Sequence, residues 1–426
     1  MASFQTRISA DTVAHDSRLA ATGLRTWHHL LTAAVAFAIF LSRRPDAILN
    51  AQFFAEDGRI WYQHAYQYGL KCLLIPDGGY LHTVSRLIAL VSLLVPLAYA
   101  PLLMNLCAMA LQILPINFFL SSRFSAIDLR LRFCCAALYA GLPNSAEIDA
   151  NITTLQWHLA LLAMIVLLAK PMASKLWMVF DFAVLVLLSL DGPNGILLIP
   201  IAAILWCKRR DAQSLARFLA LVPGATVQFV VIHSAVRAVA SNGATLDRLI
   251  RVLARRVFLS ALVGGDNHGI HHMQRYLAGS TVVVILGMGA VVYTLLRAQL
   301  EVKLFVLFGA AVFAAAMKAP LIGEYPQWEF AFQIATGCRY WFLPMLGFLA
   351  ALIWIAAERS NPIWLRSATV LVLLLTPIGM YTNWRYPSFA DLNFATYVEQ
   401  FKRAAPGTHV KIPINPPGWE MELVKR

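Results

Sequence analysis

The chain has 426 residues, of which 59% are hydrophobic and only 13% are charged. A soluble domain carries about 25% charged residues, so a soluble multidomain protein is excluded. The 24 Phe, 11 Trp and 13 Tyr exclude a disordered chain, and six Cys without a C-x-x-C pair exclude a disulfide scaffold. The composition therefore predicts an all-α polytopic integral membrane protein.

The 35 Lys and Arg residues exceed the 22 Asp and Glu residues, which gives a net charge of +13. The basic residues form short clusters between apolar runs, as expected where charge sets the topology of a membrane protein. No aromatic-basic RNA motif, zinc-ligand spacing or phosphate-binding glycine loop accompanies them. We therefore expect membrane lipids as surroundings and no nucleic acid as a partner.

Apolar runs predict about eleven transmembrane helices, since about 20 residues cross the ~30 Å hydrocarbon core. Several runs are shorter than this, so we expect their ends to extend into flanking polar residues. A membrane domain at 27–381 then lies between an N-terminal tail, 1–26, and a C-terminal tail, 382–426. The runs are 27–42, 101–121, 132–143, 152–169, 175–190, 195–207, 214–238, 279–296, 303–319, 340–357 and 363–381.

Two kinds of short loop alternate along the chain and predict its orientation. One set holds twelve basic residues and the other holds none, so the first set is expected on the cytoplasmic side. The tail after Tyr381 and the loop 239–279 are then external. The basic set is 122–132, 170–175, 208–211, 297–303 and 358–366, and the set without basic residues is 143–151, 191–194 and 320–338.

The side of the first loop, 43–83, depends on the apolar stretch 84–100 that follows it. If 84–100 lies in the membrane interface, the N-terminus is cytoplasmic and the loop is external. If 84–100 is a twelfth span, the loop is cytoplasmic, which Arg43 and Arg44 would favour. We expect the external arrangement, because the motifs in this loop fit it better.

The first motif in this loop is the adjacent acidic pair Glu56 and Asp57. The residues that follow have amphipathic spacing, which predicts a helix along the membrane surface: Ile60, Trp61, His64 and Ala65. A carboxylate beside a low-dielectric surface has a raised pKa, as a general base requires. The alternative is that the two acids only complement the dipole at the start of this helix.

The second motif is the stretch from Tyr80 to Arg86, after the turn Asp77-Gly78-Gly79. His82 and Arg86 are four residues apart and share one helical face. The planar guanidinium of Arg86 suits an anionic headgroup. Alternatively, Tyr80 and Arg86 only anchor the helix among lipid headgroups.

This layout resembles the GT-C superfamily of multi-spanning glycosyltransferases, in which a large external loop with an essential acid follows the first span. The resemblance covers roughly 27–210 and rests on Glu56, Asp57 and the interfacial stretch. It implies a sugar donor linked to polyprenyl phosphate and a glycan or lipid acceptor. Asp57 is then the first choice for the catalytic base, and Glu56 is the second.

The same resemblance implies a binding site for the donor phosphate. The residues expected to form it are Arg86, His82, Tyr80 and Arg339. The acidic motif departs from the commonest pattern of the superfamily, because Glu-Asp-Gly replaces D-x-D or E-x-D. No metal ligand is therefore assigned, and the use of a divalent cation is left open.

The first loop is also similar to stretches of uncharacterised bacterial membrane proteins assigned to surface polysaccharide synthesis. That similarity implies a bacterial inner membrane, with the N-terminus cytoplasmic and the C-terminus external. Two other functions are open: a transporter or flippase of lipid-linked saccharides, and a polysaccharide polymerase. Ionisable residues within the spans are few, Asp181 being the clearest, which argues against proton-coupled transport.

Other polar groups expected on the external side are candidates for sugar or acceptor binding. Asp149, Gln156 and Trp157 lie where two spans join, and Trp419 follows a turn in the C-terminal tail. The alternative is a plain interfacial belt of aromatic and polar residues. Three histidines within 268–272 are close in sequence, but a glycine interrupts their geometry and no metal site is expected there.

The C-terminal tail is predicted to fold against the external loops. One helix face is defined by Phe394, Tyr397, Val398 and Phe401. Residues 410–414 are expected to be a short extended segment whose pairing Pro413 limits. A rigid turn at 416–419 would then present Trp419. The tail either covers part of the active-site mouth or acts only as a structural cap.

Overall fold

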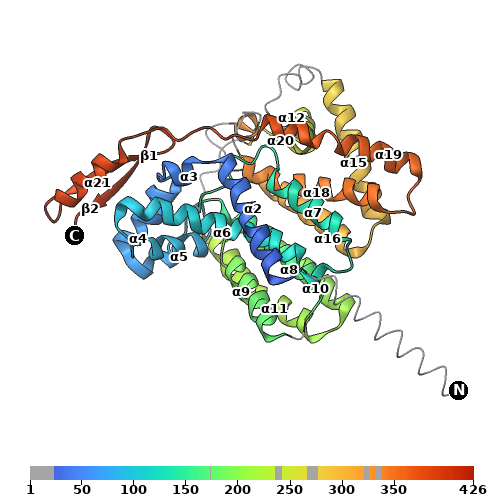
Figure 1. Cartoon of the computed structure of the whole chain (residues 1–426), viewed down its shortest axis with the longest axis horizontal. Helices are drawn as coiled ribbons and strands as arrows, with labels where there is room; N and C mark the ends of the chain where they lie inside the picture. The colour runs from blue at the N-terminus through green and yellow to red at the C-terminus, as the bar shows by residue number, and fades with distance from the viewer. Residues whose placement is uncertain (1–23, 173, 236–241, 266–276, 321–325, 332–336) are drawn as a thin grey trace.

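The computed structural model describes residues 24–172, 174–235, 242–265, 277–320, 326–331 and 337–426. Within these ranges the chain is helical apart from one C-terminal β-hairpin (Figure 1). Most of the predicted N-terminal tail and the histidine-rich segment lie outside the described residues. The predicted loop 239–279 is therefore described only in part.

Six helices of the described residues are long and apolar enough to cross a membrane, so the chain is an all-α multi-pass membrane protein. Two of them are composite: η3 (Leu97–Tyr99) continues into α6 (Ala100–Leu120), and α19 (Ile363–Leu373) continues into α20 (Thr376–Thr382). The other four are α11 (Ala212–Ser234), α15 (Leu277–Arg297), α16 (Leu300–Lys318) and α18 (Cys338–Ala357).

The prediction of about eleven spans is therefore wrong. Four runs form helices of 12 to 16 residues, which at about 1.5 Å per residue fall short of the ~30 Å hydrocarbon core. A fifth, α2, has 18 residues, but His28, His29 and Arg43 make it more polar. These helices are α2 (Thr26–Arg43), α7 (Leu129–Ala140), α8 (Leu155–Leu168), α9 (Lys175–Ser189) and α10 (Asn194–Arg209).

The burial of α8 gives the physical reason for one of these errors. Every residue of α8 except Leu168 is buried within the protein. A helix that is apolar on all sides is buried either in lipid or in a protein core. Hydropathy along the sequence does not separate these two cases, so a buried core helix resembles a span.

The helices differ in how much protein surrounds them. Within the apolar window of α18, 78% of the residues are buried, whereas the figure is 17% for both α15 and Ile363–Thr382. Large apolar side chains such as Ile285, Leu286 and Leu371 are exposed on these peripheral helices. Figure 1 shows α15 and α19 at one edge of the molecule, with α18 further inside. The exposed apolar side chains of this edge are suited to contact lipid.

Helix α8 joins the two ends of the bundle. Just before its start, Thr153 donates hydrogen bonds to Asp57, and at its end Arg209 donates to the carbonyls of Leu167 and Leu168. The segments that meet at this second end are 122–124, 169–172 and 209–217. Three of the basic loops of the sequence thus gather at one end of α8, and the acidic pair lies at the other.

The stretch 84–100 does not form a twelfth span. Residues Thr83–Ser92 form α5, a helix of ten residues, and the chain then turns at Pro96 before α6 begins. A helix of about 15 Å cannot cross the bilayer. Its length agrees instead with the interfacial alternative.

Short helices form the remaining connections. The first loop contains α3 (Asp46–Leu49), the π-helix η1 (Asp57–Tyr62), α4 (Gln63–Tyr68) and the 3-10 helix η2 (Gly69–Leu74). Later connections contain η4 (Ser122–Phe124), α12 (Leu246–Val252), the π-helix η5 (Leu253–Leu259), α13 (Ser260–Val263) and α17 (Gln327–Phe330).

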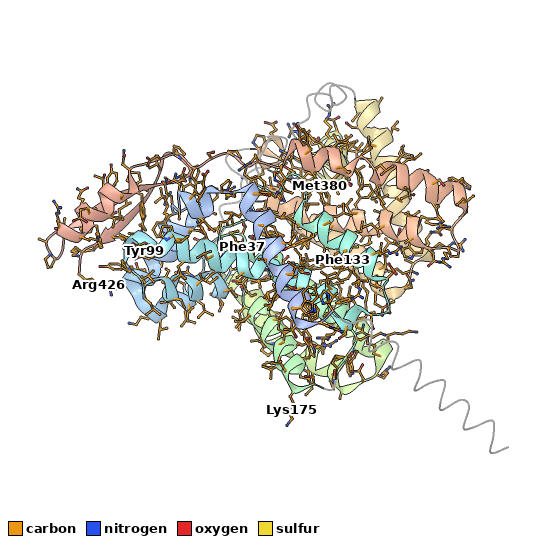
Figure 2. The ribbon with its side chains drawn as sticks, viewed as in Figure 1. Phe37, Tyr99, Phe133, Lys175, Met380 and Arg426 are labelled. Atoms are coloured by element: carbon orange, nitrogen blue, oxygen red, sulfur yellow. The ribbon has the colours of Figure 1, made fainter. Side chains whose placement is uncertain are left out.

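The C-terminal tail folds as a helix followed by a hairpin. The helix is α21 (Phe394–Arg403), and it buries Phe394, Val398 and Phe401, in agreement with the predicted helix face. Strands β1 (His409–Ile414) and β2 (Trp419–Val424) pair antiparallel over their whole length, so Pro413, contrary to our expectation, does not interrupt the register. Figure 1 shows the tail on the same arm as α4, and Figure 2 places Arg426 on this arm, far from Lys175.

Candidate active site

The acidic pair lies where the first loop enters the π-helix η1. Ala55 has a φ of +47°, a left-handed conformation that is uncommon for a residue with a Cβ atom. Gly58 packs tightly, because an added Cβ would lie 2.9 Å from the Cβ of Phe53. The chain leaves this turn with Glu56 half-buried and Asp57 buried, so the two acids differ in their access to a ligand.

Asp57 is bound to the loop before α8. It accepts hydrogen bonds from the Thr153 amide at 2.9 Å, the Thr153 hydroxyl at 2.6 Å and the Ile152 amide at 3.4 Å. Burial raises the pKa of Asp57 to about 7, although these hydrogen bonds oppose the rise. Asp57 is only 1% exposed, so it joins two segments of the protein and does not reach solvent.

Glu56 is half-buried, and its carboxylate makes no hydrogen bond with another side chain in the part of the molecule that the structure describes. Burial raises its pKa above the usual value, and the charge of Asp77 adds to this, while the charges of Arg339 and Arg59 lower it. Glu56 is therefore the carboxylate of the pair that is open to a ligand.

Arg339 lies near the start of α18, and its charge acts on Glu56. Its guanidinium forms an ion pair with Glu147, and its backbone N–H donates to the same carboxylate at 3.3 Å. The guanidinium carbon is 4.9 Å from the ring centre of Tyr340. Glu56 and Tyr80 are both close enough to act electrostatically on Arg339. Arg339 thus lies within electrostatic range of two segments that are distant from it in sequence, one with Glu56 and one with Tyr80.

Arg86 is fully buried on α5, next to the indole of Trp61. Its guanidinium carbon is 4.9 Å from that ring centre, and its Nη1 is 3.2 Å from Nδ1 of His64. The Asp77 carboxylate acts on it electrostatically, and the Cys72 thiol acts on it both electrostatically and through a weak hydrogen bond. Neither Nε nor Nη2 has a well-formed hydrogen bond within the described residues. A buried guanidinium with two unused donors is suited to bind an anion.

His82 connects the Arg86 cluster to Tyr80. Its ring centre is 4.6 Å from those of both Trp61 and Tyr80. Burial, together with the charge of Arg86, lowers the pKa of His82 to about 3, so the ring is neutral at pH 7. His82 therefore offers a hydrogen bond to a ligand but no positive charge.

Asp149, a candidate sugar ligand in the sequence, lies inside a closed polar network. Its carboxylate is 3.5 Å from Nη1 of Arg43, 3.4 Å from Nε2 of His158 and 3.3 Å from the Ser145 hydroxyl, and it accepts a hydrogen bond from the Tyr386 hydroxyl. Burial raises the pKa of Asp149, but the hydrogen bond from His158 and the charge of Arg43 outweigh it, so the net shift is downward.

Arg43 and Arg44, the two basic residues that argue for a cytoplasmic first loop, are buried structural residues. Arg43 donates to the carbonyls of Ala140 and Leu142 at 2.8 and 2.7 Å. Arg44 lies 5.1–5.6 Å from the ring centres of three aromatic residues, Phe54, Tyr386 and Phe389. Because both side chains are bound by protein, they are poor indicators of which side of the membrane the first loop occupies.

Gln156 and Trp157, two of the predicted sugar ligands, are buried at the start of α8. Gln156 packs against Gly192, where an added Cβ would overlap its Oε1 atom. The ring of Trp157 lies 5.9 Å from that of Tyr340. Trp157 therefore supports the residue next to Arg339.

Trp419, the predicted ligand in the tail, is half-buried at the start of β2. The guanidinium carbon of Arg59 lies 5.4 Å from its ring centre. In the same strand, the Glu422 amide donates to the side chain of Gln63 at 3.0 Å. The hairpin thus contacts η1 and α4, the helices that follow the acidic pair.

Two functional candidates were missed in the sequence. Thr153 has no role assigned from the sequence, yet its hydroxyl donates to Asp57 and accepts from the Trp61 indole at 3.0 Å. Asp191 falls in the predicted loop 191–194, but it is buried and accepts from the Val84 amide at 3.0 Å, and burial raises its pKa to about 7. No local pattern marks either residue, because these contacts join segments 96 and 107 residues apart.

The described residues contain no group of three or more His, Cys, Asp or Glu side chains placed to hold a metal ion. The histidines at 268–272 lie outside these residues. The charges that act on Glu56 come instead from arginines and from one further carboxylate.

Comparison with known proteins adds no relative: no family model matches the sequence, and neither a curated protein nor a solved structure matches it significantly.

Proposed function

We propose that this protein is a membrane glycosyltransferase that moves a sugar from a polyprenyl-phosphate-linked donor to a glycan or lipid acceptor of the cell envelope. The observation that carries the proposal is that Arg339 acts electrostatically on both Glu56 and Tyr80. The ring of Tyr80 in turn packs on His82, which shares the indole of Trp61 with the buried Arg86. A base and a cation at one site are what glycosyl transfer from a phosphate leaving group requires.

Glu56 is the proposed general base. The acceptor hydroxyl oxygen attacks the anomeric carbon, and Glu56 takes the hydroxyl proton as the new C–O bond forms. Its raised pKa suits this role, since a general base works best with a pKa nearer to the operating pH. Asp57, our first choice from the sequence, then serves to fix the start of η1 against Thr153.

The donor phosphate leaves with the electron pair of the broken bond between the anomeric carbon and oxygen. Negative charge develops on this phosphate, so a cation in contact with it lowers the barrier. Arg339 is a cation whose charge acts on Glu56, and Arg86 supplies two unused donors for the same phosphate. The charge of Asp77 acts on both Glu56 and Arg86, which supports the closeness of the base and the phosphate site.

The orientation is part of the proposal. Loops 122–132, 170–175 and 208–211 would face the cytoplasm, and the acidic pair would face outside, because basic loops favour the cytoplasmic side. The membrane would be the inner membrane of a bacterium, with the N-terminus inside and the C-terminal tail outside. The clustering of these three loops at the end of α8 opposite Asp57 supports this arrangement.

The test uses the purified protein in nanodiscs with a panel of polyprenyl-phosphate sugars and an extract of envelope glycolipids. We expect wild-type protein to release polyprenyl phosphate and to label an acceptor. Removing a general base costs about 10²- to 10⁴-fold, so Glu56→Gln should reduce kcat by this factor without loss of folded protein. Glu399→Gln, which changes an exposed acid on α21, is the matched control.

Three results would contradict the proposal. Movement of intact donor across the bilayer without release of polyprenyl phosphate would indicate a flippase. Extension of a glycan carried by a lipid pyrophosphate, with no use of monophosphate donors, would indicate a polymerase. Loss of activity in Asp57→Asn with full activity in Glu56→Gln would reverse the roles of the two acids.

A further inference from the structure

Asn415 joins the C-terminal hairpin to the segment that precedes Glu56. Its backbone N–H donates to the carbonyl of Phe53 at 3.0 Å, and its carbonyl accepts from the amide of Ala55 at 2.5 Å. The two segments therefore run side by side for one step of a parallel ladder, although about 360 residues separate them in sequence.

The side chain of Asn415 extends the same connection. Its Nδ2 donates to Oε1 of Gln52 at 3.0 Å and to the carbonyl of Ala390 at 3.1 Å, and its Oδ1 accepts from the Ala390 amide at 2.9 Å. An amide side chain supplies a donor and an acceptor together, which a carboxylate or a hydrocarbon does not. Asn415 is 2% exposed, so water does not compete for these bonds.

These contacts bracket a strained point of the chain. The left-handed backbone of Ala55 is unfavourable for a residue with a Cβ atom and persists only where its surroundings fix it. Its amide is bound by Asn415, and its carbonyl accepts from the Arg59 amide. On the other side of Glu56, an added Cβ at Gly58 would lie 3.1 Å from Cδ1 of Ile414. Residues 414 and 415 thus contact the chain on both sides of Glu56.

We propose that Asn415 is a positioning residue that fixes the backbone of Ala55, and through it the carboxylate of Glu56, in the geometry that glycosyl transfer needs. This inference rests on the proposed function. It gives the tail a specific role in the site, whereas a structural cap would affect only the amount of folded protein.

The test compares Asn415→Ala with the wild type by hydrogen exchange and by kinetics. The variant keeps the backbone bonds to Phe53 and Ala55 but removes the side-chain bonds to Gln52 and Ala390 that hold residue 415 in place. We therefore expect faster exchange of the Ala55 amide, with unchanged exchange in α18. A displacement of about 1 Å can cost about 10²-fold in rate, so kcat should fall about 10- to 100-fold while KM for the donor stays within about twofold. Glu420→Ala, an exposed change in β2 that leaves Asn415 in place, is the matched control.

The pH profile separates positioning from a loss of folded protein. Glu56 owes its raised pKa first to burial, and Asp77, Arg339 and Arg59 are the charged groups that act on it. Because Asn415→Ala releases Glu56 toward solvent, the acid limb of kcat should shift to lower pH. A mere loss of active protein would lower kcat at every pH by the same factor, and that result would overturn the inference.

Gln52→Met provides a milder variant if Asn415→Ala fails to fold, because it removes one acceptor of Asn415 and keeps a side chain of similar size. It should also speed the exchange of the Ala55 amide and shift the acid limb of kcat to lower pH, by smaller amounts than Asn415→Ala. Unchanged exchange of Ala55 in a folded Asn415→Ala protein would overturn the inference even if the protein transfers sugar. If Asn415→Ala speeds the exchange of the Ala55 amide but the wild-type protein has no transferase activity, the contact is supported and only the proposed function is rejected.

Discussion

Two buried charged clusters adjoin the loop before α8, and they differ in how fully protein groups pair their charges. In the first, the carboxylate of Asp149 has four polar partners: Arg43, His158, Ser145 and Tyr386. In the second, Arg86 packs on Trp61, whose indole donates to Thr153 of the same loop. This guanidinium is equally buried, but two of its nitrogens have no well-formed hydrogen bond among the described residues, apart from a weak one to the Cys72 thiol.

The difference separates a charge that stabilises the fold from a charge that is ready for a ligand. A buried charge is tolerated where its partners replace water, and it is costly where they do not. In the Asp149 cluster, protein groups pair the carboxylate and two of the three nitrogens of Arg43, and Nε of Arg43 alone has no hydrogen-bond partner among the described residues. The Arg86 cluster would meet this requirement when an anion binds, which makes it the better candidate for substrate recognition.

The largest effect on stability is expected from removing one charge of the Asp149 cluster. Asp149→Asn leaves Arg43 buried without its carboxylate, and loss of one member of a buried ion pair costs about 3–5 kcal/mol. We expect the free energy of unfolding in mixed SDS micelles to fall by this amount. A loss below about 1 kcal/mol would show that the cluster does not stabilise the fold.

The Arg86 cluster should respond in the opposite way. Arg86→Met replaces an incompletely paired cation with an apolar side chain, so we expect unchanged or higher stability in the same unfolding assay. A hydrogen bond to a charged group is worth about 1.5–3 kcal/mol, so KM for the donor should rise about 10- to 150-fold. Severe destabilisation with normal donor binding would mean that Arg86 is structural, like Arg43.

The sequence predicted the class of fold but not the number of spans. Composition established a helical membrane protein, and the spacing of Phe394, Val398 and Phe401 predicted α21. The count of about eleven spans failed in part because helices such as α9 are too short, and in part because α8 is apolar and lies inside protein, not lipid. Whether an apolar helix faces lipid depends on its neighbours, and periodicity within one helix does not contain that information.

The site was predicted in part, for similar reasons. The pattern of the first loop pointed to the acidic pair and to the stretch from Tyr80 to Arg86. Local sequence could not rank the two acids, because the burial of Asp57 depends on Thr153, which is 96 residues away. The contact of Asn415 with the first loop joins opposite ends of the chain, and no local pattern indicates it.

The smallest effect concerns the pH dependence of stability. It follows from Asp57 and Asp191, the buried acids outside the Asp149 cluster. Asp57 has a pKa near 3.8 when unfolded and about 7 when folded, so the folded protein binds the extra proton between these values. Its contribution to stability is therefore fully present below pH 3.8 and is lost as the pH rises through about 7. Asp191 shifts in the same direction, whereas the pKa of Asp149 shifts downward.

We therefore expect the melting temperature of the wild type to fall by a few degrees between about pH 5 and about pH 8, and Asp57→Asn to reduce this slope. The double variant Asp57→Asn, Asp191→Asn should reduce it further, because it removes both acids whose folded pKa lies near 7. Glu420→Gln, which changes an exposed acid on the hairpin, should keep the wild-type slope. If the double variant kept the wild-type slope, the protons that cause it would bind elsewhere in the chain. That result would contradict the assignment of the pH dependence to Asp57 and Asp191.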